Sequence, residues 1–165
     1  MIRAWRIVKR KHARTAFSGE GARLFGGRWN SPGNRVVYCA GSLALAALEV
    51  LVHADDVSLM AQYAAIEINI PGPLMQDVDP MELPRNWSAA SPPRQFRLIG
   101  DRWIEGGESA VLEVPSTVVP IERNYLLNPA HPGFEKIRIG METRFRFDRR
   151  LISPAGSRRG AASNG

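Results

Sequence analysis

The sequence predicts an α+β fold, in which helices flank a mixed, mainly antiparallel β-sheet. Several short segments are apolar throughout or alternate between apolar and polar residues, and two longer segments have the apolar spacing of helices. Strands and helices do not alternate regularly, which argues against a parallel sheet. The 165 residues are enough for one core. We expect a single domain over residues 1–152 and a flexible tail over 153–165, where Ser, Gly and Ala predominate.

The first expected elements lead from the N-terminus to a central helix. IRAWRIV, residues 2–8, alternates well enough for a strand. SGEGARLFGGRWNSPGN, residues 18–34, is rich in glycine, so it is either an irregular ligand-binding loop or a set of turns. RVVYCA, residues 35–40, is typical of a buried strand. The apolar run that follows predicts a helix over 42–53, with Ser42 as its N-cap.

The second half of the chain adds strands and one more helix. AQYAAIEINI, residues 61–70, predicts a strand, and apolar spacing predicts a helix from about 93 to 104. Residues 71–93 are rich in proline and acidic residues, so we expect a surface connection with a helical turn or two. The remaining expectations are a strand over 110–116, a turn over 118–129, and terminal strands in FEKIRI (134–139) and TRFRFD (143–148).

Composition narrows the classes of function. Cys39 is the only cysteine, which excludes an internal disulfide and any cysteine-based zinc cluster. Because it lies in the apolar segment VVYCA, we expect a buried, unreactive thiol rather than a nucleophile. No apolar run approaches the roughly 20 residues of a membrane span, and MIRAWRIVKRKHAR lacks the apolar core of a secretory signal. We therefore expect a cytoplasmic protein that does not enter membranes.

Charge is distributed unevenly along the chain, with a formal net charge of +6 and a pI near 10.2. Residues 1–35 and 136–165 are strongly basic, whereas residues 36–135 carry most of the acidic side chains. The basic ends either flank an anion-binding site or pair with the chain's own acidic residues. A basic nucleic-acid-binding module, with Trp29 or Trp103 stacking on bases, is therefore the alternative to an enzyme.

The expected helix over 42–53 carries a carboxylate, Glu49, in an otherwise apolar run. Helical spacing places Glu49 on one stripe with Ser42 and His53. A carboxylate at the edge of a core needs hydrogen-bond donors, because an unpaired buried charge is costly. One interpretation is a Glu49–His53 pair, or a pair with an arginine, that only stabilises the helix face. Glu49 and His53 are also half of a metal site, but no recognised zinc spacing supplies a third ligand, so we expect no metal.

The segment GGRWNSPG, residues 26–33, is a second candidate for binding. Its paired glycines allow close backbone approach, Arg28 offers a forked cation, Trp29 a stacking surface and Asn30 an amide. This group suits a phosphate with an attached ring. The other interpretation is a turn in which Arg28 makes an internal salt bridge.

Tyr38 and Ser116 are polar residues on or at the end of expected strands. Tyr38 lies on the strand before the helix, where a tyrosine is more often a core residue than a ligand contact. Ser116 ends the strand VLEVPS. A Ser-His-Asp hydrolase is poorly supported, because Ser116 lacks a nucleophile elbow.

A series of motifs in this order resembles the RES-domain family: GGRWNSPG, VVYCAGSLALAALEVLVH, LP and W within 83–87, GDRW at 100–103, VLEVPS, and NYLLNPAHPGF. The resemblance extends from about Arg3 to Arg146. It implies a compact domain similar to ADP-ribosyltransferases. It also implies the toxin half of a bacterial toxin-antitoxin pair, and an activity that breaks the nicotinamide–ribose bond of NAD.

The resemblance also implies the site. The family's arginine, tyrosine, glutamate and serine match Arg28, Tyr38, Glu49 and Ser116. Cleavage passes through an oxocarbenium-like state that a fixed carboxylate stabilises, so Glu49 is the central catalytic candidate, with Arg28 and Tyr38. We expect Arg28 to hold the pyrophosphate or its ribose and Tyr38 to stack on nicotinamide, while Ser116 binds the ribose or orients Glu49. Weaker candidates for NAD contacts are Arg6, Asn30 and Asn124.

The acceptor of ADP-ribose is left open by these residues. Water makes the protein an NAD glycohydrolase, phosphate an NAD phosphorylase, and a protein side chain a mono-ADP-ribosyltransferase with a cytosolic target. The family implies a helical, Xre-like antitoxin that occludes the active site. The uneven charge leads us to expect an acidic contact segment on that partner. For the toxin itself we expect no direct contact with nucleic acid.

Overall fold

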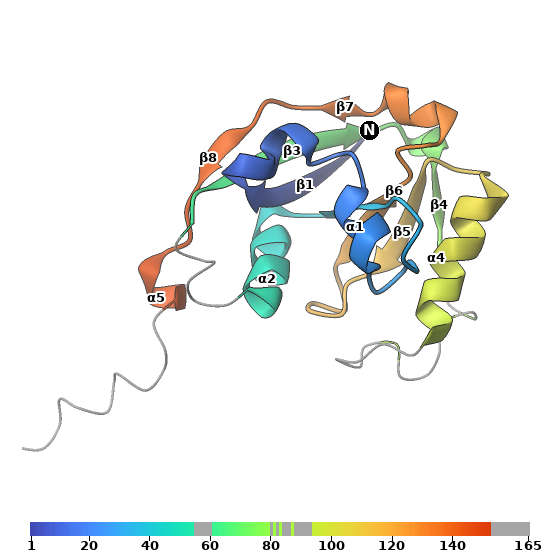
Figure 1. Cartoon of the computed structure of the whole chain (residues 1–165), viewed down its shortest axis with the longest axis horizontal. Coiled ribbons are helices and arrows are strands. Elements are labelled where there is room, and N and C mark those ends of the chain that lie inside the picture. Colours follow the sequence, from blue (N-terminus) through green and yellow to red (C-terminus); the bar gives the residue numbers. More distant parts are fainter. Residues whose placement is uncertain (55–60, 80, 82, 84–86, 88–93, 153–165) are drawn as a thin grey trace, which may run out of the picture.

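The computed structural model is organised around one curved β-sheet (Figure 1). It describes residues 1–54, 61–79, 81, 83, 87 and 94–152, and the expected tail over 153–165 lies outside them. Among these residues the sheet has eight strands in the order β4-β5-β6-β2-β1-β3-β7, and β8 also pairs with β3. Every pairing is antiparallel except that of β4 with β5. The expected α+β class with a mainly antiparallel sheet is confirmed.

The elements have the following bounds. The strands are β1 (Ile2–Lys9), β2 (Val37–Ala40), β3 (Tyr63–Ile70), β4 (Met75–Asp77), β5 (Val111–Pro115), β6 (Arg123–Leu127), β7 (Arg138–Ile139) and β8 (Thr143–Phe145). The α-helices are α1 (Glu20–Phe25), α2 (Leu43–His53), α4 (Arg94–Gly106) and α5 (Arg149–Ile152), and the 3-10 helices are η1 (Arg10–Thr15), η2 (Gly72–Leu74) and η4 (Pro132–Lys136). The expected positions of β1, β2, α2, β3, α4 and β5 are confirmed, as are terminal strands at β7 and β8.

Two expectations of irregular structure are wrong. The glycine-rich stretch contains the helix α1, which begins after Gly19 and ends before Gly26, both at positive φ (68° and 71°). Glycine permits these positive φ angles, which allow the chain to enter and leave the short helix sharply. The expected turn over 118–129 contains the strand β6. Tyr125 and Leu126 are both buried, so the strand lacks the alternation of a half-exposed one.

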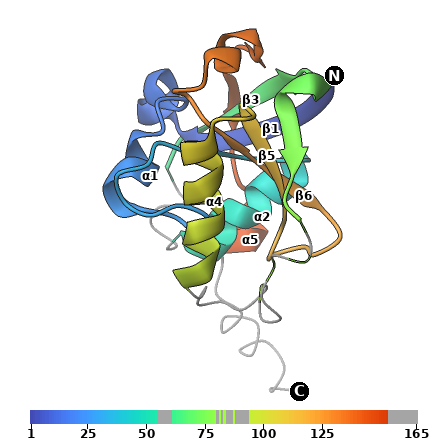
Figure 2. The same ribbon diagram turned by 90° about the vertical axis from the view of Figure 1, so that its right-hand side faces the viewer.

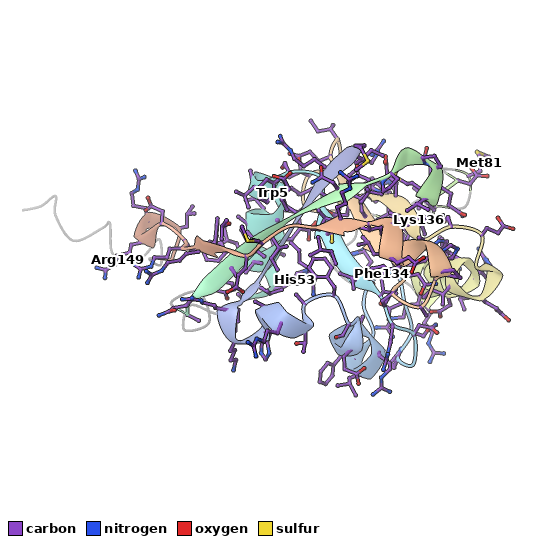
Figure 3. The ribbon with its side chains drawn as sticks, turned by 90° about the horizontal axis from the view of Figure 1, so that it is seen from above. Trp5, His53, Met81, Phe134, Lys136 and Arg149 are labelled. Atoms are coloured by element: carbon purple, nitrogen blue, oxygen red, sulfur yellow. The ribbon has the colours of Figure 1, made fainter. Side chains whose placement is uncertain are left out.

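Two further expectations, for residues 71–93 and for FEKIRI (134–139), are wrong in part. The connection over 71–93 has the expected helical turn, η2, but it also contains β4, a strand of three residues that is too short to leave a clear pattern. The segment FEKIRI begins in η4 rather than as a strand, because His131 caps that turn by accepting from the Gly133 N–H. From η4, with Phe134 and Lys136, the chain runs across the top of the molecule to Arg149 in α5 (Figure 3).

Helices α2 and α4 lie over the same face of the sheet (Figures 1 and 2). Ala40 of β2 packs with the α2 residue Leu45, and Leu126 of β6 packs with the α4 residue Phe96. Alternate strand residues, Val37 among them, point to the opposite face and form a separate cluster there. The sheet therefore has a buried layer on each side, and both long helices cover the face that carries Tyr38.

The sheet opens between β1 and β2. These two strands pair at one register, Trp5 with Ala40, whereas β1 pairs with β3 along its whole length. Beyond this point the Arg6 side chain spans the gap, because its Nη1 donates to the Tyr38 carbonyl at 2.6 Å. The missing backbone pairing leaves room between the two halves of the sheet, and α2 packs against both strands beside this opening.

The helix α2 has the expected N-cap. Ser42 Oγ accepts from the Leu45 N–H at 3.0 Å and donates to Glu122 Oε2 at 2.9 Å, which ties the start of the helix to the loop before β6. Leu45 and Ala46 are buried, which anchors the first turns in the core. Of the helices in the described part of the chain, none is both long and apolar enough to span a bilayer.

Candidate active site

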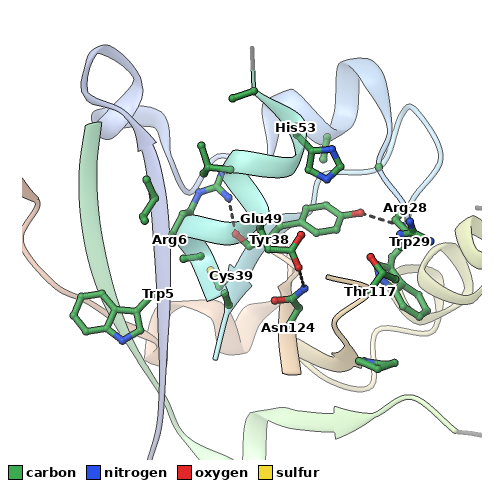
Figure 4. A pocket seen from close by; sticks show the side chains of 18 of the residues that line it. Trp5, Arg6, Arg28, Trp29, Tyr38, Cys39, Glu49, His53, Thr117 and Asn124 are labelled. Carbon is green, nitrogen blue, oxygen red and sulfur yellow. Dashed lines mark hydrogen bonds between the residues drawn. The ribbon is translucent and has the colours of Figure 1, made fainter. Parts of the chain in front are cut away.

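A cavity of about 620 Å³ lies beside the opening of the sheet (Figure 4). Its volume is in the range typical of small-molecule sites, roughly 300–1,000 Å³. Strands β1, β2 and β6, helices α2 and α4, and the loop over 26–29 all contribute to its wall. The lining residues with charged or titratable side chains are Arg6, Arg28, Tyr38, Cys39, Glu49, His53 and Arg97. Residues distant in the sequence therefore meet at one site.

Glu49 reaches into the cavity from α2, and one of its two oxygens is held by hydrogen bonds. Ser116 Oγ donates to Glu49 Oε1 at 3.0 Å. Asn124 Nδ2 donates to the same oxygen at 2.7 Å (Figure 4). No described residue donates to the other oxygen, Oε2. The carboxylate is therefore fixed in orientation, with one oxygen left for a ligand.

Ser116 is completely buried, and its hydrogen bonds determine where its proton points. Its Oγ accepts from the amides of Val118 and Val119, each at 3.1 Å. The single hydroxyl proton is therefore directed to Glu49. Ser116 does not line the cavity itself, so it acts on the site through the carboxylate.

Neither the Glu49–His53 pair nor a metal site at Glu49 is observed among the described residues. His53 lines the cavity one turn along α2, but Glu49 bonds to Ser116 and Asn124 instead. Ser116 directly follows β5 and Asn124 lies in β6, both far from α2 in the sequence, so helix spacing alone does not predict them. Within the described part of the chain, no cluster of His, Cys, Asp or Glu side chains is arranged to hold a metal ion.

Tyr38 presents its ring to the cavity and uses its hydroxyl to hold the glycine-rich loop. The hydroxyl donates to Asn30 Oδ1 at 2.7 Å and accepts from the Trp29 N–H at 3.2 Å. Burial raises the pKa of Tyr38, so the hydroxyl stays protonated. Gly27 must be a glycine here, because a Cβ at this position would overlap the Tyr38 hydroxyl. The loop that carries Arg28 is therefore attached to β2.

Asn30 is fully buried and does not line the cavity. Its Nδ2 donates to the carbonyls of Ala22, Ser31 and Asn34, and its Oδ1 accepts from Tyr38. All polar atoms of this side chain are thus used to shape the loop, which differs from the expected contact with NAD.

Trp29 is only 3% exposed, and its ring packs edge-on against Phe96 at 5.2 Å between centroids. Helix α4 therefore covers most of the Trp29 ring, although Trp29 still lines the cavity. Trp103 is also buried, and its Nε1 donates to Ser109 Oγ. The nucleic-acid alternative requires Trp29 or Trp103 to stack on bases, and both side chains are buried.

Helix α4 holds the loop through residues that sequence analysis did not assign. Asp101 Oδ1 accepts from the Ser31 N–H at 2.9 Å and from Asn34 Nδ2 at 2.6 Å. The Nε of Arg97 donates to the Gly27 carbonyl at 3.2 Å. A Cβ at Gly100 would overlap the carbonyl of the loop, so only glycine allows this approach. Gly100 and Asp101 belong to the motif GDRW, which was noted in the sequence without a role. Both residues hold the glycine-rich loop.

Three arginines line the cavity together with the carboxylate, and Arg28 interacts with it. Burial lowers the pKa of Arg28, whereas the charge of Glu49 raises it, so the two groups interact electrostatically. Arg28 Nη1 also donates to the Trp87 carbonyl at 3.3 Å. Arg6 is more deeply buried, which lowers its pKa, and its Nε has no hydrogen-bond partner. Burial raises the pKa of the neighbouring Cys39 to about 12, in agreement with an unreactive thiol.

A sequence model of a known family, described as the RES domain, matches residues 3–148. The chain belongs to the RES domain family. It is 38% identical to "Toxin Res" of Yersinia enterocolitica, over 89% of this chain and 97% of that protein. It is 40% identical to "Toxin Res" of Photorhabdus laumondii, over 90% and 96%. It is 36% identical to "Prs ADP-ribosylating toxin" of Sphingobium sp., over 92% and 97%.

The RES domain also resembles a solved structure. A chain in the crystal structure of the M. tuberculosis MbcT-MbcA toxin-antitoxin complex superposes with a TM-score of 0.71 at 22% identity, covering 87% of this chain and 84% of that one. The superposition shows that the two chains share a fold, in agreement with the expected single α+β domain. In this RES domain, Arg28, Tyr38, Glu49 and Asn124 line one cavity, and Ser116 contacts it through Glu49.

Proposed function

We propose that this RES domain cleaves the bond between nicotinamide and ribose in NAD. The observation that carries the proposal is the arrangement of Glu49, which lines the cavity with Oε1 held by two donors and Oε2 left without one among the described residues. Departure of nicotinamide leaves positive charge on the ribose ring. A carboxylate fixed in advance stabilises that charge without having to reorganise.

The other lining residues fit the remaining parts of NAD. Arg28 binds the pyrophosphate or its ribose, since a guanidinium fork matches phosphate oxygens. The Tyr38 ring stacks on nicotinamide, while its hydroxyl is occupied by the loop. Ser116 orients Glu49 rather than binding ribose, because it is buried behind the carboxylate. Arg6 and Asn124 contribute further polar groups to the cavity wall, and no metal takes part in the proposed reaction.

We further propose that the chain is the toxin of a toxin-antitoxin pair that acts in the cytoplasm. Relatives with 36–40% identity are named as toxins, and the solved neighbour is a toxin-antitoxin complex. The partner is a helical, Xre-like antitoxin that covers the cavity. An acidic contact segment on it matches a wall with three arginines, Arg6, Arg28 and Arg97.

The direct test is incubation of the purified chain with NAD, with and without phosphate and cell lysate, followed by mass analysis. Free ADP-ribose identifies water as the acceptor, ADP-ribose 1-phosphate identifies phosphate, and modified protein identifies a protein side chain. Glu49→Gln is the matched control, because the amide oxygen can still accept from Ser116 and Asn124. NAD that stays intact under all three conditions contradicts the proposal.

A further inference from the structure

Arg97 is the one α4 residue that lines the cavity. Its Nε–H donates to the Gly27 carbonyl, which fixes the guanidinium next to the loop that carries Arg28. Gly100 and Asp101, one turn further along α4, hold the same loop. The position of Arg97 relative to Arg28 is therefore set by several contacts between one helix and one loop.

The charge of Arg97 is not neutralised by the described residues. None of their carboxylates lies within ion-pair distance of it, and Asp101 uses its Oδ1 to accept from Ser31 and Asn34. The two Nη groups of Arg97 have no hydrogen-bond partner among the described residues, and neither is buried. A half-buried guanidinium with free donors in a cavity is suited to an anionic ligand.

Arg97 and Arg28 are close to a common point. The charges of both guanidinium groups lower the otherwise raised pKa of the Tyr38 hydroxyl, which means that both lie within electrostatic range of it. The charge of Glu49 partly compensates that of Arg28. The wall of the cavity therefore has two cations on the side of the loop and α4.

A dinucleotide carries two linked phosphates, and one guanidinium fork fits the oxygens of one phosphate at a time. We propose that Arg97 is the second diphosphate-binding residue of the site, and that with Arg28 it selects dinucleotides over mononucleotides. This inference rests on the proposed cleavage of NAD. It adds a specificity-determining residue from α4 to the residues matched by the family motifs.

The test compares NAD with nicotinamide mononucleotide, which has the same scissile bond but one phosphate. For Arg97→Gln we expect kcat/KM for NAD to fall roughly 10- to 100-fold, the cost of one charge-assisted hydrogen bond, mostly through a higher KM. Turnover of the mononucleotide should change less than about threefold. Arg97→Lys keeps the charge without the fork and should lose less. Arg94→Gln removes the same charge from an exposed position on α4 and should leave kcat/KM unchanged for both substrates.

A second variant separates binding from loop positioning. Asp101→Asn weakens the hold on the loop that packs against Tyr38 but leaves the Arg97 charge in place, so it should impair the mononucleotide as well as NAD, whereas Arg97→Gln should impair NAD selectively. Equal losses for the two substrates in Arg97→Gln, or no loss for either, overturn the inference. If Arg97→Gln does not fold, the same ratio is measured on Arg97→Lys. Wild-type protein that consumes no NAD contradicts the proposed function itself, whereas active wild type with an unchanged Arg97 variant contradicts only this inference.

Discussion

Replacing Ser116 with alanine tests whether a buried hydroxyl orients the catalytic carboxylate. The change removes the donor to Glu49 and leaves the amides of Val118 and Val119 without their acceptor. A hydrogen bond to a charged group is worth about 1.5–3 kcal/mol, so turnover of NAD should fall roughly 10- to 100-fold. The two backbone amides lie in a half-buried loop. Loss of their hydrogen-bond acceptor should therefore lower the free energy of unfolding by about 2 kcal/mol.

The assay measures NAD consumption and urea unfolding on the same samples. Ser109→Ala is the matched control, because Ser109 is also buried and hydrogen-bonded but lies outside the cavity. It should lower stability by a similar amount while NAD turnover stays within about twofold of the wild type. If Ser116→Ala keeps full turnover, or loses no more than the control, Ser116 does not orient Glu49 and the mechanism is wrong.

Three further predictions concern the loop, the thiol and the edge of the sheet. Gly100→Ala should cost about 1–3 kcal/mol of stability in thermal unfolding, because its Cβ meets the Trp29 carbonyl, whereas Gly106→Ala meets no atom and should be near neutral. Cys39, with its pKa raised to about 12 by burial, should resist iodoacetamide in the folded protein and react after unfolding; alkylation of folded protein contradicts this. Burial and then Asp77 raise the pKa of Glu113, so its charged form disfavours the fold. Glu113→Gln should therefore be more stable than wild type at pH above the folded pKa, with a gain that shrinks as the pH falls through it, measured by urea unfolding across pH.

Local sequence patterns were sufficient for the elements whose causes are local. Ser42 followed by an apolar run predicts α2, because the cap and the helix lie within a few residues of each other. The strand β3 was equally clear from its β-branched and aromatic residues. The strand β6 was missed because its register is set by β2 and β5 on either side, and its own residues include buried side chains on both faces.

Local sequence patterns have the same limit for the candidate site. The sequence indicated that Glu49 needs donors, and local spacing favoured His53, four residues away. The actual donors, Ser116 and Asn124, are separated from it by 67 and 75 residues. Asp101 is 70 residues from the Ser31 amide that it accepts. Such partners are brought together by strand order and helix packing, which periodicity along the chain does not encode.

The opening of the sheet explains why a carboxylate is tolerated on an apolar helix. If β1 and β2 paired fully, the space beside α2 would be closed and Glu49 would be a costly buried charge. Because they pair only at Trp5 and Ala40, the carboxylate faces a cavity with arginines in its wall. Glu49→Gln can keep both hydrogen bonds at Oε1, so the variant should fold at least as stably as wild type while NAD cleavage is lost. Stability that falls together with activity would instead make Glu49 a structural residue, and the cavity would need another catalytic group.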